Sequence, residues 1–162
     1  MPVDIERFIF LKTICGWLDK ERIIMWDFAD IYKKDQFAVS YLTLHEWNYK
    51  KLKKKTIKSF LDANGYKNIA VYSLGTLGNL FLEEAVKENI QISYIVDKNN
   101  SMFPTQIHNI PVIGLQDVSN QTSVDAIVIC HVYYFNQIAD DLVKLGIKEE
   151  QLLSLNDIVF SL

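Results

Sequence analysis

The chain has 162 residues, which is enough for one ordinary domain with a short additional segment and too little for a two-domain enzyme. Its composition, with 49% hydrophobic, 12% aromatic and 23% charged residues, excludes disordered and fibrous proteins. The formal net charge of -3 gives no general attraction to nucleic acid or to anionic membranes, so we expect neither as a partner. No apolar run reaches the roughly 18 to 20 residues that a membrane span needs.

The cysteines and histidines indicate where the protein works and what it does not bind. Cys15 and Cys130 are far apart, and the first residues lack the basic and apolar pattern of a secretory signal, so we expect a cytoplasmic protein. His45 and His108 have no cysteine or carboxylate at metal-ligand spacing. We therefore expect no metal site.

The first 65 residues differ in composition from the rest. Ten of the twenty aromatic residues, including all three tryptophans, lie before residue 50. The apolar spacing predicts one helix between Ile5 and Leu18 and a second at Ile23–Tyr32. Because the second helix is apolar on nearly every side, we expect it to pack on the following domain, on a partner protein or on another copy of the chain. Residues 1–65 are thus predicted to be a helical appendage and residues 66–162 a separate domain.

The end of this appendage carries a capping signal and a run of lysines. The sequence Thr-Leu-His-Glu at 43–46 has the pattern of a capping box, which predicts a helix from there to a stop at Asn64-Gly65. Six lysines lie between Lys50 and Lys58, and such a run is usually a solvated face, although it would also suit a phosphate or an acidic polymer.

From residue 66 onward, strands and helices alternate. Strands are predicted at Asn68–Tyr72, Ile90–Val96, Ile110–Ile113, Val124–Ile129 and Leu152–Leu155. Helices are predicted after Gly75, at Leu115–Ser119, from Phe135 to a cap at Gly146, and in a final turn that begins at Asn156 or Asp157. This alternation predicts parallel strand pairing through right-handed crossovers. The expected fold is a Rossmann-like, doubly wound α/β sheet of four to five strands.

The turn after the first predicted strand carries a degenerate glycine fingerprint. Ser73-Leu74-Gly75-Thr76-Leu77-Gly78 matches G-x-G-x-x-G at its second and third glycines, and Ser73 replaces the first. Gly75 would let a phosphate approach the backbone, where the amides of Thr76 and Leu77 and the helix dipole favour negative charge.

An acidic residue follows the fingerprint at the spacing of nucleotide-binding domains. Asp97 stands 19 residues beyond Gly78, at the end of the second predicted strand, where a carboxylate would accept a hydrogen bond from a ribose hydroxyl and repel a 2′-phosphate. We therefore predict that Ser73, Gly75–Gly78 and Asp97 bind NAD or a nucleoside diphosphate in preference to NADP.

Two other interpretations of the fingerprint remain open. The two glycines would also allow close packing of a helix on a strand in a domain that binds nothing there, because the Ser73 side chain narrows the phosphate groove. The protein would then be a non-catalytic sensor or interaction module. As a third possibility, Asp97 would hold the ribose of S-adenosylmethionine in a methyltransferase-type domain.

Four stretches together resemble known sugar-nucleotide proteins. They are Ile69–Gly78, Ile95–Lys98, Ile110–Gly114 and Val124–Ile129. They are similar to the Rossmann-like domain of bacterial polysaccharide-biosynthesis epimerase/dehydratases and to the nucleotide-sugar-binding domain of sugar acyltransferases. Over residues 66–160 the resemblance implies binding of NAD or a nucleoside-diphosphate sugar in surface-polysaccharide metabolism, with Gly75–Gly78 and Asp97 as the contacts.

Candidates for catalysis are few. Cys130 and His131 lie at the end of the fourth predicted strand, the edge at which open α/β sheets bind ligands. Adjacent strand residues face opposite sides, so these two do not form a thiolate–imidazole pair, but one of them is expected to line a pocket. Tyr49 and Lys53 have the Tyr-x-x-x-Lys spacing of short-chain dehydrogenases, which a segment so rich in lysine produces by chance. Catalysis is left open.

Overall fold

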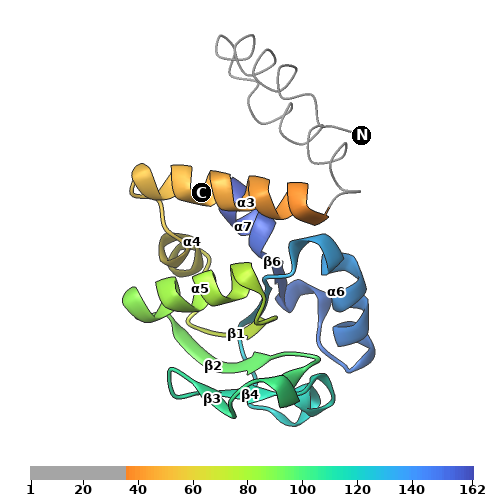
Figure 1. Ribbon diagram of the computed structural model, residues 1–162. Coiled ribbons are helices and arrows are strands. Elements are labelled where there is room, and N and C mark those ends of the chain that lie inside the picture. Colours follow the sequence, from red (N-terminus) through yellow and green to blue (C-terminus); the bar gives the residue numbers. More distant parts are fainter. Residues whose placement is uncertain (1–35) are drawn as a thin grey trace, which may run out of the picture. The chain divides into compact units, whose positions relative to one another are not determined.

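The computed structural model describes residues 36–162 (Figure 1), and within it Ser40–Leu162 form one compact unit. The two helices predicted before residue 33, together with Cys15, lie outside the described residues. The oligomer expected through that segment and the division of the chain at residue 65 therefore stay predictions.

A six-stranded sheet forms the centre of the described part. Its strands are β1 (Asn68–Tyr72), β2 (Gln91–Val96), β3 (Gln106–Ile107), β4 (Ile110–Ile113), β5 (Ala126–Ile129) and β6 (Leu152–Ser154). They lie in the order β3-β4-β2-β1-β5-β6, and all pairs are parallel except β3 with β4. The predicted Rossmann-like, doubly wound class is confirmed. The additional strand is β3, which lies where the sequence indicated a loop.

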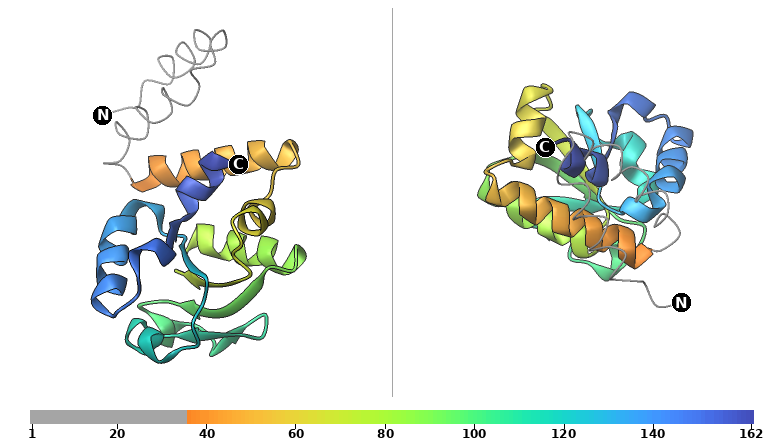
Figure 2. Two further views of the ribbon diagram at one scale, coloured as in Figure 1. Left: turned by 180° about the vertical axis from the view of Figure 1, so that it is seen from behind. Right: turned by 90° about the horizontal axis from the view of Figure 1, so that it is seen from above.

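Helices flank both faces of the sheet (Figures 1 and 2). They are α3 (Gln36–Leu52), α4 (Ile57–Ala63), α5 (Thr76–Lys87), α6 (Phe135–Lys144) and α7 (Leu155–Ser161). Short 3-10 turns occur at η1 (Asn100–Met102), η2 (Leu115–Asn120), η3 (Val132–Tyr134) and η4 (Glu149–Gln151). Figure 1 shows α4 and α5 on one side of β1 and α6 on the other. Within residues 36–162, none of the helices combines the length and the apolar character needed to cross a bilayer.

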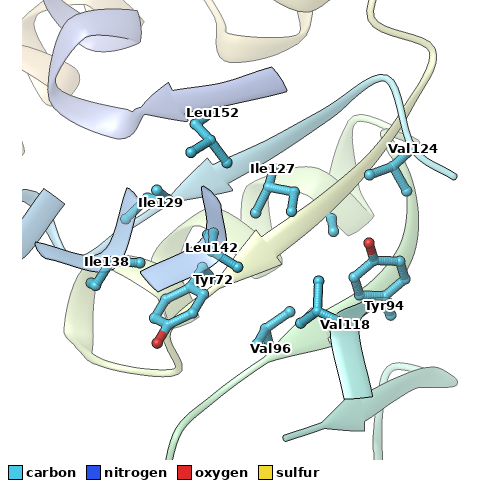
Figure 3. Close-up of a cluster of buried hydrophobic side chains, with 11 residues drawn as sticks. Tyr72, Tyr94, Val96, Val118, Val124, Ile127, Ile129, Ile138, Leu142 and Leu152 are labelled. Atoms are coloured by element: carbon cyan, nitrogen blue, oxygen red, sulfur yellow. The ribbon is translucent and has the colours of Figure 1, made fainter. Parts of the chain in front are cut away.

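Both faces of the central strands are buried, which explains why they read as continuous apolar runs. One face carries Ala70 and Tyr72 of β1, which pack with Ile127 and Ile129 of β5 and with Leu142 of α6 (Figure 3). On β1 the alternate residues Ile69 and Val71 point to the opposite face and are fully buried as well.

The predicted capping box at residues 43–46 is wrong. α3 begins at Gln36 and runs through Thr43, whose side chain is fully buried and donates a hydrogen bond to Asn156 Oδ1 of α7 at 2.9 Å. A capping box does occur at Thr56, whose hydroxyl accepts from the amide of Ser59 and whose amide donates to the Ser59 hydroxyl at the start of α4.

The single helix predicted up to Asn64-Gly65 is two helices, α3 and α4. The chain turns between them at Lys54, which has a φ of +59°. The predicted end of the second helix is confirmed, because α4 stops at Ala63 and Gly65 has a φ of +78° in the left-handed region.

Several lysines of the run pair with nearby groups. Lys50 lies 3.5 Å from Glu46, and Lys58 lies 2.9 Å from Asp62 one turn along its own helix. Lys51 of α3 reaches across to α5, where its ammonium lies 2.7 Å from the buried carboxylate of Glu84. This ion pair and the Thr43 hydrogen bond fix α3 on the sheet domain.

A hairpin ends the sheet on the side of β4. Its turn consists of His108 and Asn109, with φ values of +51° and +64°, and Ile107 pairs with Ile110 across it. Positive φ at both central residues is the signature of the two-residue type I′ turn, which asparagine tolerates well.

Candidate functional site

The carboxyl ends of β1 and β5 form the topological switch point of the sheet. After β1 the chain crosses to β2 on one side, and after β5 it crosses to β6 on the other. Open α/β sheets bind ligands in the crevice at such a point. Two loops border it, and we call Ser73–Gly75 the first loop and Cys130–Tyr134 the second loop.

The first loop has a left-handed residue where the fingerprint would have its first glycine. Ser73 has a φ of +85°, a conformation that costs a residue with a Cβ about 1 to 2 kcal/mol. Its amide donates to the carbonyl oxygen of Val96 at 2.8 Å, and its hydroxyl accepts from the amide of Gly75 at 3.3 Å. The serine therefore adopts the glycine turn and places its hydroxyl within the loop.

The two glycines of the fingerprint differ in the space that surrounds them. A Cβ at Gly78 would lie 1.9 Å from the carbonyl oxygen of Ser73, so only glycine fits where α5 meets the first loop. A Cβ at Gly75 would meet only the Ser73 hydroxyl, at an ordinary 3.5 Å, and Gly75 has an unstrained φ of -71°. Packing within the described residues thus requires glycine at 78 and not at 75.

The start of α5 presents backbone amides at this edge. Gly75 is the N-cap of α5. The first hydrogen bond of the helix runs from the amide of Asn79 to the carbonyl oxygen of Gly75, at 2.9 Å. The amides of Thr76, Leu77 and Gly78 precede that first helical bond, where a helix leaves its amides without intrahelical acceptors. Gly75 and Thr76 are exposed, so an anion has access to the positive end of the helix.

Asp97 faces the first loop, as its predicted role requires. Its Oδ2 accepts from the amide of Leu74 at 2.8 Å, and its Oδ1 accepts from the amide of Asn99 at 2.8 Å. The carboxylate therefore joins the first loop to the turn after β2, a role that the sequence did not indicate. Each carboxylate oxygen has capacity for a second hydrogen bond from a further donor.

The second loop is apolar at its base and aromatic at its rim. Cys130 is buried, and burial raises the pKa of its thiol, which keeps it protonated and unsuited to nucleophilic attack. The pKa of His131 is lowered by burial, and this is partly offset by a backbone hydrogen bond and by the charge of Asp97. The His131 ring lies 4.9 Å from that of Tyr134, which in turn contacts Tyr133 edge-on at 4.9 Å.

The structure thus brings part of the predicted site to one edge of the sheet. Ser73, the start of α5, Asp97 and the second loop all lie at the carboxyl ends of β1, β2 and β5. The Tyr49–Lys53 pair lies elsewhere, with Tyr49 on α3 and Lys53 in the turn after it, and the lysine ammonium sits 4.2 Å above the phenol ring as a cation–π contact.

The two histidines outside this edge make other contacts. His45 lies beside Tyr41 on α3, and His108 Nε2 lies 3.1 Å from Glu83 Oε1. Within residues 36–162, no three histidine, cysteine or acidic side chains are grouped so as to hold a metal ion.

Sequence reasoning missed three further polar residues at this edge. Tyr72, read as a strand residue, buries a hydroxyl at the end of β1, and no hydrogen-bond partner for it lies within the described residues. Lys98 and Asp141 form an ion pair at 2.8 Å that ties the turn after β2 to α6. The pair joins residues 43 positions apart, so no local pattern could reveal it.

Taken together, the sheet order and the loop–helix junction define a Rossmann-like α/β domain. A family model described as "C2185-like, N-terminal" matches residues 65–153, more than half of the chain. The chain belongs to this family. The description of this family does not mention polysaccharide biosynthesis. The resemblance to polysaccharide-biosynthesis epimerase/dehydratases is therefore not supported by this comparison. A search of curated proteins found no match.

Among solved structures, the chain is similar to RSP, a Rex-family repressor. The TM-score is 0.46 at 20% identity, over 64% of this chain and 62% of that one. RSP in complex with β-NADH gives 0.46 at 21% identity, over 64% and 63% of the two chains. RSP with β-NAD+ and operator DNA gives 0.43 at 19% identity, over 59% and 54%. The chain therefore covers less than two thirds of the length of each of these solved chains.

Proposed function

We propose that this protein binds a nucleotide at the switch point, with a phosphate against the start of α5 and the base or sugar against the second loop. The candidate ligands are NAD and nucleoside-diphosphate sugars, the latter on the strength of the sequence resemblance alone. Asp97 places a negative charge where NADP would bring a 2′-phosphate, and so disfavours that cofactor.

The observation that carries this proposal is the space beside Gly75. Glycine is required by packing at 78, but at 75 the backbone is unstrained and a methyl group would meet ordinary contacts. A ligand that approaches the backbone closely is a physical reason for a glycine there, because a Cβ would occupy the position of a phosphate oxygen.

The amides and the aromatic rim supply complementary chemistry. The exposed start of α5 offers N–H donors and the positive end of the helix dipole to a phosphate. The rings of His131 and Tyr134, which are tilted by 57° to each other, offer aromatic contacts to a base or to a sugar face. No nucleophilic step is assigned to Cys130, the one thiol at this edge within residues 36–162, because it is buried and protonated.

A melting experiment tests the proposal. NAD+, AMP, UDP-glucose and S-adenosylmethionine are each added to the protein. A ligand at 100 times its Kd stabilises the folded state by about 2.7 kcal/mol, which raises the Tm by several degrees. Gly75→Ala should abolish most of the shift. The control is Gly114→Ala, because Gly114 is also an extended N-cap glycine after a strand, β4, and lies outside the first loop. Its Cβ would lie 3.3 Å from the Asn100 and Asp117 side chains, so each variant's shift is measured from its own Tm without ligand.

One observation favours a second candidate, an interaction module whose first loop is empty. The Ser73 hydroxyl already accepts the Gly75 amide, so part of the loop is satisfied without a ligand. Under this alternative none of the four compounds shifts the Tm, and Gly75→Ala behaves like wild type. Such a result would remove the nucleotide proposal and leave the fold assignment.

A further inference from the structure

A buried hydroxyl without a partner lies directly behind the first loop. Tyr72 is the last residue of β1 and is 3% exposed, and no hydrogen-bond partner of its hydroxyl lies within the described residues. Figure 3 shows its ring beside Ile138, with the hydroxyl directed away from the other labelled side chains. A phenylalanine would fill the same space without burying a polar atom, so the hydroxyl calls for an explanation.

Two carboxylates lie at the edge of the sheet where this hydroxyl is buried: Tyr72 pairs with Val96 in the parallel ladder, Asp97 follows Val96, and Asp141 lies on α6. Burial raises the pKa of Tyr72 to about 12, and the negative charges of Asp97 and Asp141 add to the rise. At neutral pH the phenol is therefore protonated and is a hydrogen-bond donor. Asp97 is the residue that also holds the first loop, and Asp141 is paired with Lys98. The hydroxyl thus belongs to the same edge as the predicted nucleotide contacts.

The hydrogen-bonding capacities of the Tyr72 phenol and of the carboxylates determine which ligand group would bond to both. A protonated phenol needs an acceptor, whereas carboxylates need donors. A phosphate would be repelled by the carboxylates, and a carbonyl oxygen would give them nothing to accept. A hydroxyl group satisfies both, because it accepts from the phenol and donates to a carboxylate.

We propose that Tyr72 is a specificity-determining residue of the nucleotide site, whose hydroxyl donates a hydrogen bond to a ribose hydroxyl that in turn donates to Asp97. This inference rests on the proposed function and adds a contact on the α6 face of the sheet.

The same cluster contains a matched control. Tyr94 of β2 is also 3% exposed and packs in the same apolar cluster (Figure 3), but burial alone raises its pKa. Tyr94→Phe therefore changes the packing as Tyr72→Phe does, but it removes a hydroxyl whose pKa shows no influence of a carboxylate.

The test is calorimetric titration of the full chain with AMP and with 2′,3′-dideoxy-AMP. Tyr72→Phe should bind AMP about tenfold more weakly than wild type, the worth of one hydrogen bond, and Tyr94→Phe should stay within about twofold. Wild type should bind the dideoxy compound more weakly than AMP, and Tyr72→Phe should show a smaller preference, because the hydrogen bond to Asp97 is still available. Without ligand, Tyr72→Phe should melt no lower than wild type, which shows that it folds.

The outcomes separate the two proposals. Equal AMP affinity of Tyr72→Phe and wild type overturns the role of Tyr72 and leaves nucleotide binding intact. Equal losses in Tyr72→Phe and Tyr94→Phe also overturn it, because they point to packing. NAD+ binding without AMP binding places the contact off the adenosine half and overturns it too. If wild type binds none of the nucleotides, both proposals fail.

Discussion

The two loops at the switch point are held in place by different means. The first loop is fixed by backbone hydrogen bonds, from Ser73 to Val96 and from Leu74 to Asp97, and by the close contact of Gly78. The second loop is fixed by a buried Cys130 and by rings that contact one another. Under the proposed function the two loops would contact different parts of one ligand, because the start of α5 after the first loop suits an anion and the rings of the second loop suit a base or sugar.

The largest expected effect is that of Gly78→Ala. The new Cβ would overlap the backbone of Ser73, so it strains the first loop, whereas its contact with Cys130 at 3.6 Å would be an ordinary one. We expect a loss of about 3 kcal/mol in the free energy of unfolding, at the upper end for overpacking. Urea denaturation measures it, with Gly75→Ala as the control that should change stability by less than about 1 kcal/mol. Equal losses in the two variants would contradict the different roles given to the glycines.

Asp97→Ala should have the next largest effect. It removes the acceptor of the Leu74 and Asn99 amides and should cost about 2 kcal/mol, since hydrogen bonds to charged groups are lost and two amides are left unpaired. It should also remove the nucleotide-dependent Tm shift.

Asp125→Ala is the control for that variant. Asp125 likewise accepts from two backbone amides, those of Lys67 and Asn68, but at the opposite edge of the sheet. It should leave the nucleotide shift unchanged. A shift that survives Asp97→Ala would show that the carboxylate serves only to join the two turns.

Ser73→Gly should change stability little. It relieves a positive φ worth about 1 to 2 kcal/mol and loses a hydrogen bond worth about 1 kcal/mol, so the net change should stay within about 1 kcal/mol. Because it restores the complete glycine fingerprint, it should tighten nucleotide binding in a titration with NAD+. Weaker binding would instead mean that the serine hydroxyl contacts the ligand.

The smallest effect concerns the second loop and pH. The pKa of His131 is lowered in the folded state, mainly by burial, so the unfolded chain binds more protons as the pH falls below about 6.5. Wild type should therefore lose stability between pH 7.5 and pH 5.5, whereas His131→Phe, which keeps a ring, should lose less. The urea midpoints at the two pH values provide the comparison. Parallel pH profiles would show that His131 is not the titrating group.

Regular elements of the α/β domain were predictable where a local pattern determines them. The apolar runs located β1 and β4 with their observed bounds. For β1 the reason is burial, because buried parallel strands are apolar without interruption. The stop at Gly65 was predictable because glycine takes the left-handed conformation there. The helical spacing of apolar residues also predicts Leu80 and Val143 on the core faces of α5 and α6, but both are exposed, because the faces in contact with the sheet are narrower than that spacing indicates.

The remaining features depend on contacts distant in sequence. Thr43 resembles a helix cap, but its hydroxyl bonds to Asn156, 113 residues away. The Ser73–Gly78 pattern located the first loop, yet the double hydrogen bond of Asp97 depends on how two turns meet. Tyr72 looked like any strand aromatic, because nothing in the sequence shows that its hydroxyl lacks a partner.

The hairpin of β3 and β4 has a consequence for how the protein behaves in solution. A parallel strand at the rim of a sheet exposes a row of unpaired amides and carbonyls that another chain can extend into a fibril-like ladder. Here β4 is covered by β3, which is only two residues long, and the tight turn at His108-Asn109 ends the pairing. The rim therefore offers an incoming strand little backbone to add to, which protects this side of the molecule against aggregation.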